Sequence, residues 1–270
     1  MAVTDRDLCI AAAIAGATVV RVRYGRGVAH DRQALTAVAL DAEQAILEVL
    51  RAARPDDAVR TARTGPTGGP TGSPTGSPGG RTWLVDPLSG SLAPAAGTPE
   101  VAVSLALRDG SETAVAVSAD PFAGEVFWTD GRGAYARRGD VDERLTPWAG
   151  SRLVDVNLDP PPPHSPAFRA ARLLTDARLT GRLRPAPTAT TLAVSRVAAG
   201  RRAAYVTDGD LRDSVPFAAG IALCRAAGCV VTGLRGQRLH TGAGGLLVAA
   251  DHETHAALLA AVEDQFAAAR

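Results

Sequence analysis

Hydrophobic residues in this chain occur first with the period of a helix and then in short strand-like runs, and this order limits the folds open to it. Apolar residues, many of them alanine, have helical spacing from about residue 5 to 23 and again from about residue 31 to 54. We therefore predict two amphipathic helices packed side by side, with Asp31 as a candidate cap of the second helix.

The next ordered region has a strand-like pattern of short runs separated by turn residues. The runs are VAVSLAL from Val101, TAVAVS from Thr113 and EVFWTD from Glu125, and each is bounded by Gly, Asp or Pro. These runs predict an antiparallel meander, and GRGAYARRG over residues 131–139 predicts a further hairpin of the same sheet.

A proline-rich stretch, residues 159–163, separates the meander from a region in which short strands alternate with helical segments. The helical segments are TATTLAVSRVAAG, FAAGIALCRAAG and HETHAALLAAVEDQF. Because such alternation is typical of layered α/β units, we predict an N-terminal α+β lobe over residues 1–150 and a C-terminal α/β lobe over residues 151–270.

Four copies of a four-residue pattern, GPTG, GPTG, SPTG and SPGG, lie between the second helical segment and the meander, from Gly65 to Gly80. Proline and glycine at this density oppose both helix and sheet, and the stretch has no apolar side chain to bury. We predict a disordered, mobile surface loop over about residues 62–80.

The composition excludes several classes of protein. Hydrophobic residues make up 46% of the chain and charged residues 21%, which indicates neither a disordered chain nor a membrane protein. The 29 basic and 28 acidic residues give a net charge of +1, so no overall field favours nucleic acid or anionic membranes as partners. All the basic residues are arginine, which excludes chemistry based on lysine.

The N-terminus and the cysteines both indicate a cytoplasmic location. Charged residues 5–7 precede the first apolar stretch, which is therefore not a signal peptide. Cys9, Cys224 and Cys229 have no CxxC spacing, and no cluster of histidines accompanies them, so we predict buried, reduced thiols rather than a zinc site.

Two distant segments resemble the signature motifs of the inositol monophosphatase-like superfamily. WLVDPLSGS, residues 83–91, resembles W-x-x-D-P-[hydrophobic]-D-G-T, and VPFAAGIALCRAAGCVVTGLRG, residues 215–236, resembles the W-D-x-A-A-G segment and the A-G-G-x-[VI]-T segment that follows it. AEQAILEVLRAARPDD near Glu43 and GEVFWTDGRGAY agree with neighbouring family segments. The resemblance covers nearly the whole chain and implies an α/β fold of alternating helix and sheet layers in two packed lobes, and a homodimer.

The resemblance also implies a chemistry, for which this chain lacks most of the residues. Phosphomonoesterases of the family are expected to hold catalytic Mg²⁺ ions with several carboxylates. Asp86 matches the first aspartate, and Leu88 matches the position whose carbonyl binds metal. Ser89 stands where the second aspartate belongs, and Pro216 stands where the aspartate of the later motif belongs, with Val215 in place of its tryptophan.

Two further expected positions are altered. The glutamate ligand of the family precedes the first motif, but no acidic residue lies between Asp57 and Asp86. In the second helix, Thr36 matches the threonine that precedes a supporting aspartate, and Ala39 replaces that aspartate. Asp41 lies two positions further on, which on a helix is a rotation of about 200°, so it is expected to point away.

Three functions remain open on these residues. The first is a pseudophosphatase that binds a phosphorylated or polyol-like small molecule, or a protein partner, without hydrolysis. The second is an active phosphatase of inositol or sugar phosphates with a remodelled site, in which Asp86 and Leu88 would hold Mg²⁺ as the cofactor. The third is a metal-independent enzyme of specialised metabolism, for which no nucleophile or base can be named, so no catalytic residue is assigned.

Two groups of residues are candidates for binding a ligand. Ser89, Gly90 and Ser91 would bind phosphate where a loop enters a helix, although Ser91 is equally well explained as a helix cap. Asp86, without its partner carboxylates, is better explained as a turn residue before Pro87. Asp208, Asp210 and Asp213 are interpreted either as substrate-side or metal ligands or, more simply, as a solvated turn. Three histidines are interpreted as surface residues: His240, His252 and His255.

Overall fold

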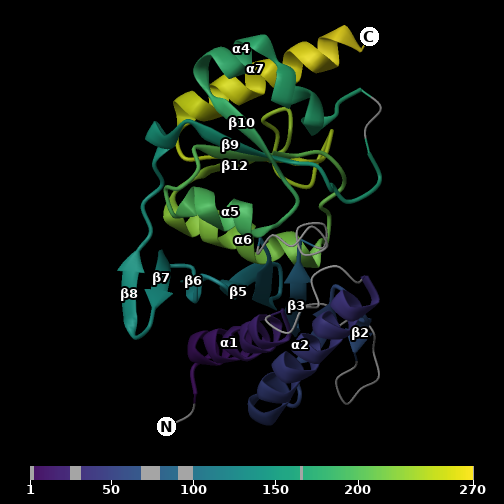
Figure 1. Ribbon diagram of the computed structural model, residues 1–270, viewed down its shortest axis with the longest axis vertical. Coiled ribbons are helices and arrows are strands. Elements are labelled where there is room, and N and C mark those ends of the chain that lie inside the picture. The colour runs from purple at the N-terminus through teal and green to yellow at the C-terminus, as the bar shows by residue number, and fades with distance from the viewer. Residues whose placement is uncertain (1–2, 25–31, 68–79, 91–99, 165–166, 270) are drawn as a thin grey trace. The chain divides into compact units, whose positions relative to one another are not determined.

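A computed structural model describes residues 3–24, 32–67, 80–90, 100–164 and 167–269, and these residues form two compact units. The first unit comprises Met1–Arg144, Thr190–Leu192 and Val215–Leu223, and the second comprises Leu145–Ala189, Ala193–Ser214 and Cys224–Arg270. Each unit has a β-sheet and helices of its own (Figure 1), so the predicted layered α/β fold is confirmed.

The two predicted helices of the first unit are confirmed. Helix α1 spans Asp5–Tyr24 and α2 spans Arg32–Ala53, and they pack against each other. A Cβ atom at Gly16 of α1 would lie 2.7 Å from Ile46 Cδ1 of α2, so glycine permits the close approach. The candidate cap Asp31 lies outside the described residues.

The sheet of the first unit has eight strands in the order β2-β1-β3-β4-β5-β6-β7-β8. The strands are β1 (Ala58–Thr61), β2 (Gly65–Thr67), β3 (Arg81–Ser89), β4 (Ala102–Asp109), β5 (Glu112–Asp120), β6 (Glu125–Thr129), β7 (Ala134–Arg138) and β8 (Val141–Arg144). Each strand from β3 to β8 pairs antiparallel with the next, which confirms the predicted meander and hairpin. Strand β1 pairs parallel with β3.

The prediction that the GPTG stretch contains no sheet is wrong at its first copy. Gly65–Thr67 forms β2, which pairs antiparallel with β1, and Pro66 lies opposite Arg60. An edge strand has hydrogen bonds on one side only, so it tolerates a proline that lacks an N–H donor. The pattern therefore excludes a central strand but not an edge strand, and residues 68–79 lie outside the described residues.

Both faces of the first sheet are covered, which explains why β3, β4 and β5 are buried almost continuously instead of alternating. Helices α1 and α2 cover one face (Figure 1), where they contact Trp83, Val85, Val103 and Leu105. On the other face, Leu84 and Ala106 pack against Val215 and Ala219 of helix α6 (Val215–Ala227).

The second unit contains a five-stranded mixed sheet in the order β10-β9-β11-β13-β12, and its strands alternate with helices as predicted. Its elements are β9 (Leu153–Asn157), η2 (Ala170–Thr175), α4 (Ala177–Arg182), β10 (Arg184–Thr188), α5 (Leu192–Ala198), β11 (Ala204–Thr207), β12 (Val230–Thr232), β13 (Leu246–Ala249) and α7 (His252–Ala268). Strand β9 pairs parallel with β10 and β11, and β13 pairs antiparallel with β11 and β12. Leu258, Val262 and Phe266 of α7 complete its core.

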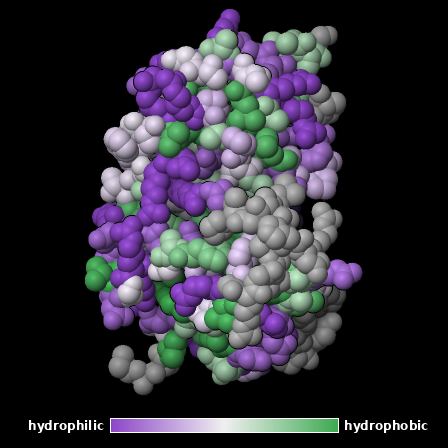
Figure 2. Space-filling model, viewed as in Figure 1, coloured by the Kyte–Doolittle hydropathy of each residue, from purple (hydrophilic) through white to green (hydrophobic). Residues whose placement is uncertain are grey.

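Surface and thiol properties agree with the composition. On the face shown in Figure 2, hydrophobic residues are scattered among hydrophilic ones. None of the described helices is long and apolar enough to cross a bilayer. All three cysteines are free; Cys9 and Cys224 are buried as predicted, whereas Cys229 is only partly buried.

Candidate functional site

Asp86 lies near the end of β3 and is buried, with 2% of its surface exposed. Its Oδ1 accepts a long hydrogen bond of 3.4 Å from the backbone N–H of Leu88, and the Ser89 side chain also bonds to the carboxylate. Within the described part of the chain, its Oδ2 has no hydrogen-bond partner. Burial raises the pKa of Asp86 to about 6, although the charge of Arg63 acts in the opposite direction.

Arg63 is the cation of this site, and the sequence analysis missed it. Its Nη2 donates to the carbonyl oxygen of Leu88 across 3.4 Å, and its charge acts on Asp86. A guanidinium thus contacts the carbonyl that the motif assigns to metal binding, and its charge acts on the carboxylate that the motif assigns to the same role. The segment between Asp57 and Asp86 lacks carboxylates but contains arginines, and these arginines were the sequence signal for a cation at the site.

Hydrogen bonds hold the turn after β1, which carries Arg63. The backbone N–H of Ala62 donates to the carbonyl oxygen of Val85 (2.9 Å), which ties the turn to β3. The N–H of Thr64 donates to Thr61 Oγ1 (3.0 Å), and the Thr64 hydroxyl donates to Glu43 Oε1 of α2 (2.6 Å). Because the turn is tied to both a strand and a helix, the backbone at Arg63 is fixed on both sides.

The predicted phosphate ligands Ser89 and Gly90 make contacts within the protein. Ser89 is 8% exposed, and its Oγ accepts hydrogen bonds from Thr191 Oγ1 (2.7 Å) and from the Thr191 N–H (3.2 Å). Gly90 has φ +92°, and a Cβ atom there would lie 2.7 Å from the carbonyl oxygen of Glu100. These contacts give both residues a packing role, and Ser91 lies outside the described residues.

Replacing Gly90 with alanine is expected to lower the free energy of unfolding by about 2 kcal/mol, because it combines left-handed backbone strain with a steric overlap. Gly110→Ala is the matched control, since Gly110 has φ +61° and open space around its Cβ position. Urea unfolding followed by circular dichroism measures both variants. An equal loss in the two would show that the contact with Glu100 contributes nothing.

The other altered motif positions have structural explanations. Ala39 of α2 is fully buried, whereas Thr36 is exposed. Asp41 forms an ion pair with Arg23 of α1, in agreement with the expected rotation away from Ala39. Pro216 is in the first turn of α6, where a proline has no intrahelical hydrogen bond to lose.

The donor atoms present do not fit the cluster of Mg²⁺ ions that the motifs imply. The Leu88 carbonyl oxygen already accepts from a cation, the Ser89 hydroxyl is bonded to Thr191, and the side chain of Pro216 has no donor atom. Among the described residues, no group of three or more His, Cys, Asp or Glu side chains could hold a metal ion. Asp86 is the one carboxylate that the two motifs retain.

In the second unit, the interpretation of Asp208 as part of a solvated turn is wrong. Asp208 is 1% exposed, its Oδ1 accepts from the N–H of Ala170 (3.1 Å), and its Oδ2 lies 3.1 Å from Arg169 Nε. His164 Nδ1 lies 4.0 Å from the same Oδ2. The sequence could not show this burial, because Arg169 and Ala170 belong to a separate segment.

The other two aspartates of the cluster do lie in a turn. Asp213 is exposed with φ +58°, and partly buried Asp210 accepts from the N–H of Arg212 (2.9 Å). A cavity of about 250 Å³ opens beside Asp210 within this unit. Its polar lining includes His164, Arg212 and His240. These donors and acceptors suit a hydroxylated or anionic small molecule.

The two histidines of α7 differ in their exposure to solvent. His252 is exposed on α7, as predicted, but His255 is half-buried, with its Nε2 2.8 Å from Thr232 Oγ1. Burial lowers the pKa of His255, so its neutral form is favoured in the folded protein.

Comparison with known proteins gives one family for the chain. A model of the inositol monophosphatase family matches residues 5–266. The chain is 33% identical over 103 residues to the Nus factor SuhB of Pasteurella multocida, an alignment that covers 38% of this chain and 36% of that protein. It is 30% identical over 165 residues to the inositol-1-monophosphatase ImpA of Mycolicibacterium smegmatis, covering 57% and 56% of the two chains. These alignments thus span about a third to a half of the relatives.

Solved structures share the fold along nearly the whole chain. The extragenic suppressor protein suhB of Bartonella henselae has a TM-score of 0.73 and 22% identity, and the match covers 93% of this chain and 98% of that one. Mycobacterium tuberculosis SuhB has a TM-score of 0.73 and 23% identity, covering 97% and 96%.

Proposed function

Because this chain belongs to the inositol monophosphatase family but holds an arginine against the Leu88 carbonyl, with its charge acting on Asp86, we propose that it is a pseudophosphatase. It keeps the family fold and binds a phosphorylated or polyol-like small molecule, or a protein partner, without metal-dependent hydrolysis. The observation that carries the proposal is the contact of Arg63 with the Leu88 carbonyl beside Asp86.

Electrostatics supports the loss of metal binding. Two unit charges 4 Å apart interact by about 1 kcal/mol in water and about 4 kcal/mol near a protein surface, and a divalent ion doubles this. The repulsion between the guanidinium and Mg²⁺ is therefore about as large as the attraction between Mg²⁺ and a single carboxylate, so the two cancel. Mg²⁺ also loses its water reluctantly and needs several oxygen ligands, which the described residues of this site do not supply.

The same arginine supports anion binding. Arg63 is an exposed residue, and its contact with Leu88 uses one of its terminal nitrogens. A guanidinium can donate two parallel hydrogen bonds to a phosphate. A phosphate group, with the rest of the ligand carrying hydroxyls, is therefore the chemical class that we assign to the site.

A second function has one observation in its favour. The buried Oδ2 of Asp86 has no partner among the described residues, and a buried carboxylate oxygen without a hydrogen bond is available to a cation. An active Mg²⁺-dependent phosphatase of inositol or sugar phosphates is thus the alternative, with Mg²⁺ polarising the phosphate when bound.

The test is calorimetric titration of the purified protein with Mg²⁺ and with Mn²⁺, each with and without inorganic phosphate. A phosphate-release assay on a panel of inositol and sugar phosphates accompanies it. We expect phosphate to bind without metal, and no turnover. Turnover that depends on Mg²⁺ and is abolished by Asp86→Asn would establish the active phosphatase instead.

A further inference from the structure

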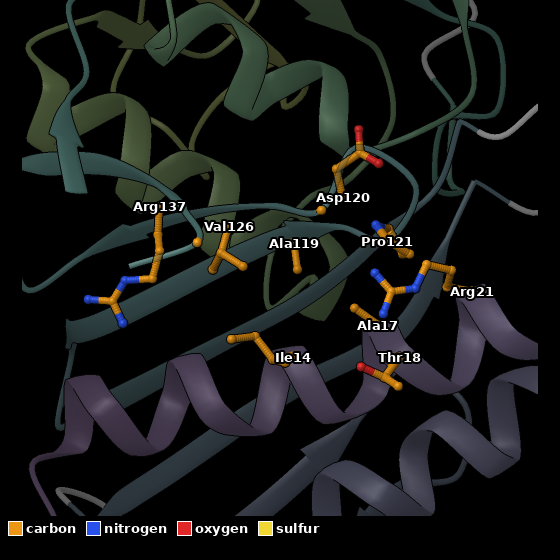
Figure 3. A pocket seen from close by; sticks show the side chains of 11 residues that line it. Ile14, Ala17, Thr18, Arg21, Ala119, Asp120, Pro121, Val126 and Arg137 are labelled. Atoms are coloured by element: carbon orange, nitrogen blue, oxygen red, sulfur yellow. The ribbon is translucent and has the colours of Figure 1, made fainter. Parts of the chain in front are cut away.

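A second cavity, of about 190 Å³, lies in the first unit between α1 and the strands β5 and β6. Figure 3 shows the side chains that line it. Helix α1 contributes Ile14, Ala17, Thr18 and Arg21, whose spacing of three, four and seven residues places them along one side of the helix. Neither Asp86 nor Arg63 lines this cavity, so it is separate from the site described above.

The middle of the cavity is apolar and the residues there are small. Ala17 of α1 and Ala119 of β5 leave the space open, and Ile14 and Val126 add branched walls. Ile14 retains 43% of its surface exposed, so the hollow is open to solvent on the helix side. Displacement of water from an apolar hollow by a hydrocarbon chain is favourable, because it removes apolar surface from water.

The charge at the rim is positive and uncompensated at one position. Among the described residues, Arg21 has neither a hydrogen-bond nor an ion-pair partner. In Figure 3, its side chain extends from α1 toward Pro121. The other lining arginine, Arg137, is held by Asp142 through two hydrogen bonds of 2.8 and 2.6 Å.

The acidic residue of the lining does not cancel the charge of Arg21. Asp120 Oδ1 accepts from the N–H groups of Phe122 (3.0 Å) and Ala123 (2.9 Å), and the carboxylate points away from α1 in Figure 3. No ion pair between Asp120 and Arg21 occurs in the described structure. The cavity therefore combines an apolar hollow with one guanidinium that no described residue pairs with.

We propose that this cavity binds a small amphipathic monocarboxylate, with its apolar chain between Ile14 and Val126 and its carboxylate on Arg21. A guanidinium matches the geometry of a carboxylate and can bind it through two hydrogen bonds. The volume corresponds to about six water molecules at roughly 30 Å³ each, so a ligand of about seven non-hydrogen atoms fits. Pentanoate has this size and is the probe.

The experiment is a titration of the ¹⁵N-labelled full chain with pentanoate, followed by amide chemical shifts. Pentanol and pentylamine replace the carboxylate with a neutral and a cationic group, and inorganic phosphate supplies an anion without an apolar chain. We expect pentanoate to shift the amides of Ala17, Thr18 and Gly124 in a saturable way, and the three other probes to bind at least about fivefold more weakly.

Two variants and a control test the assignment. Arg21→Gln is expected to weaken pentanoate binding by about tenfold, the size expected for losing a charge-assisted hydrogen bond. Ala17→Leu fills the hollow and is expected to abolish binding. Arg51→Gln removes an exposed arginine of α2 that does not line the cavity, and should leave binding unchanged.

The proposal is overturned if pentanoate causes no saturable shifts at these amides, or if Arg21→Gln binds pentanoate as tightly as the native chain. Equal binding of pentanol would remove the role of the charge, and equal binding of phosphate would remove the role of the apolar hollow. Because Arg21 is exposed, its replacement does not threaten folding. Failure here leaves the metal and phosphate titrations at Asp86 unaffected.

Discussion

Replacing Arg63 with glutamate is expected to raise the affinity of the protein for Mn²⁺ by at least about a hundredfold. The substitution removes a cation from the Leu88 carbonyl and places a second carboxylate near Asp86. A change of two unit charges beside a divalent ion is worth about 4 kcal/mol at 4 Å even with the dielectric constant of water. Since about 1.4 kcal/mol is a factor of ten, part of this gain is sufficient.

The measurement is the electron paramagnetic resonance signal of free Mn²⁺ during titration, which needs no catalytic activity. Arg51→Glu is the matched control, because it changes the net charge equally at an exposed position on α2. We expect the control to bind Mn²⁺ as weakly as the native chain. If Arg63→Glu also binds no better, the guanidinium is not what keeps metal out, and the proposed function loses its main support.

The fold was largely predictable because local patterns determine most of it. Helical spacing of buried alanines and leucines predicted α1 and α2, and strand-like runs bounded by turn residues from Val101 onward predicted the meander. The edge strand Gly65–Thr67 was missed because its pairing depends on a neighbouring strand and not on its own residues. Proline and glycine disfavour helices and central strands, but a strand at the edge of a sheet tolerates a proline.

The candidate site was predictable where its residues are adjacent in sequence and not where they meet through the fold. Asp86, Leu88 and Ser89 lie within one strand, so a motif could identify them together. Arg63 reaches Leu88 only because β1 pairs with β3, and no local pattern contains that contact. The burial of Asp208 was missed for the same reason, since its partner Arg169 lies in another segment.

Replacing Asp86 with asparagine is expected to stabilise the metal-free protein by about 3 kcal/mol at pH 7.5. Burial raises the pKa of Asp86 from 3.8 to about 6, so the folded protein holds this proton more tightly than the unfolded chain. The stability linked to that proton is present below pH 4 and is lost as the pH rises through 6. Each unit of pKa corresponds to about 1.4 kcal/mol, which gives the expected size.

The native chain and Asp86→Asn are therefore expected to have nearly equal free energies of unfolding at pH 4 and different ones at pH 7.5. Urea unfolding in EDTA at both pH values measures this, and Asp109→Asn, at an exposed strand end, is the control. The same unfolding in Mg²⁺ separates the two functions. If Mg²⁺ stabilises the native chain but not Asp86→Asn, the carboxylate binds metal, and metal binding explains the stability cost of burying it. If Mg²⁺ has no effect on either protein, Asp86 binds no metal and its burial only lowers stability. That result is the one expected of a pseudophosphatase in which Arg63 is the cation of the site.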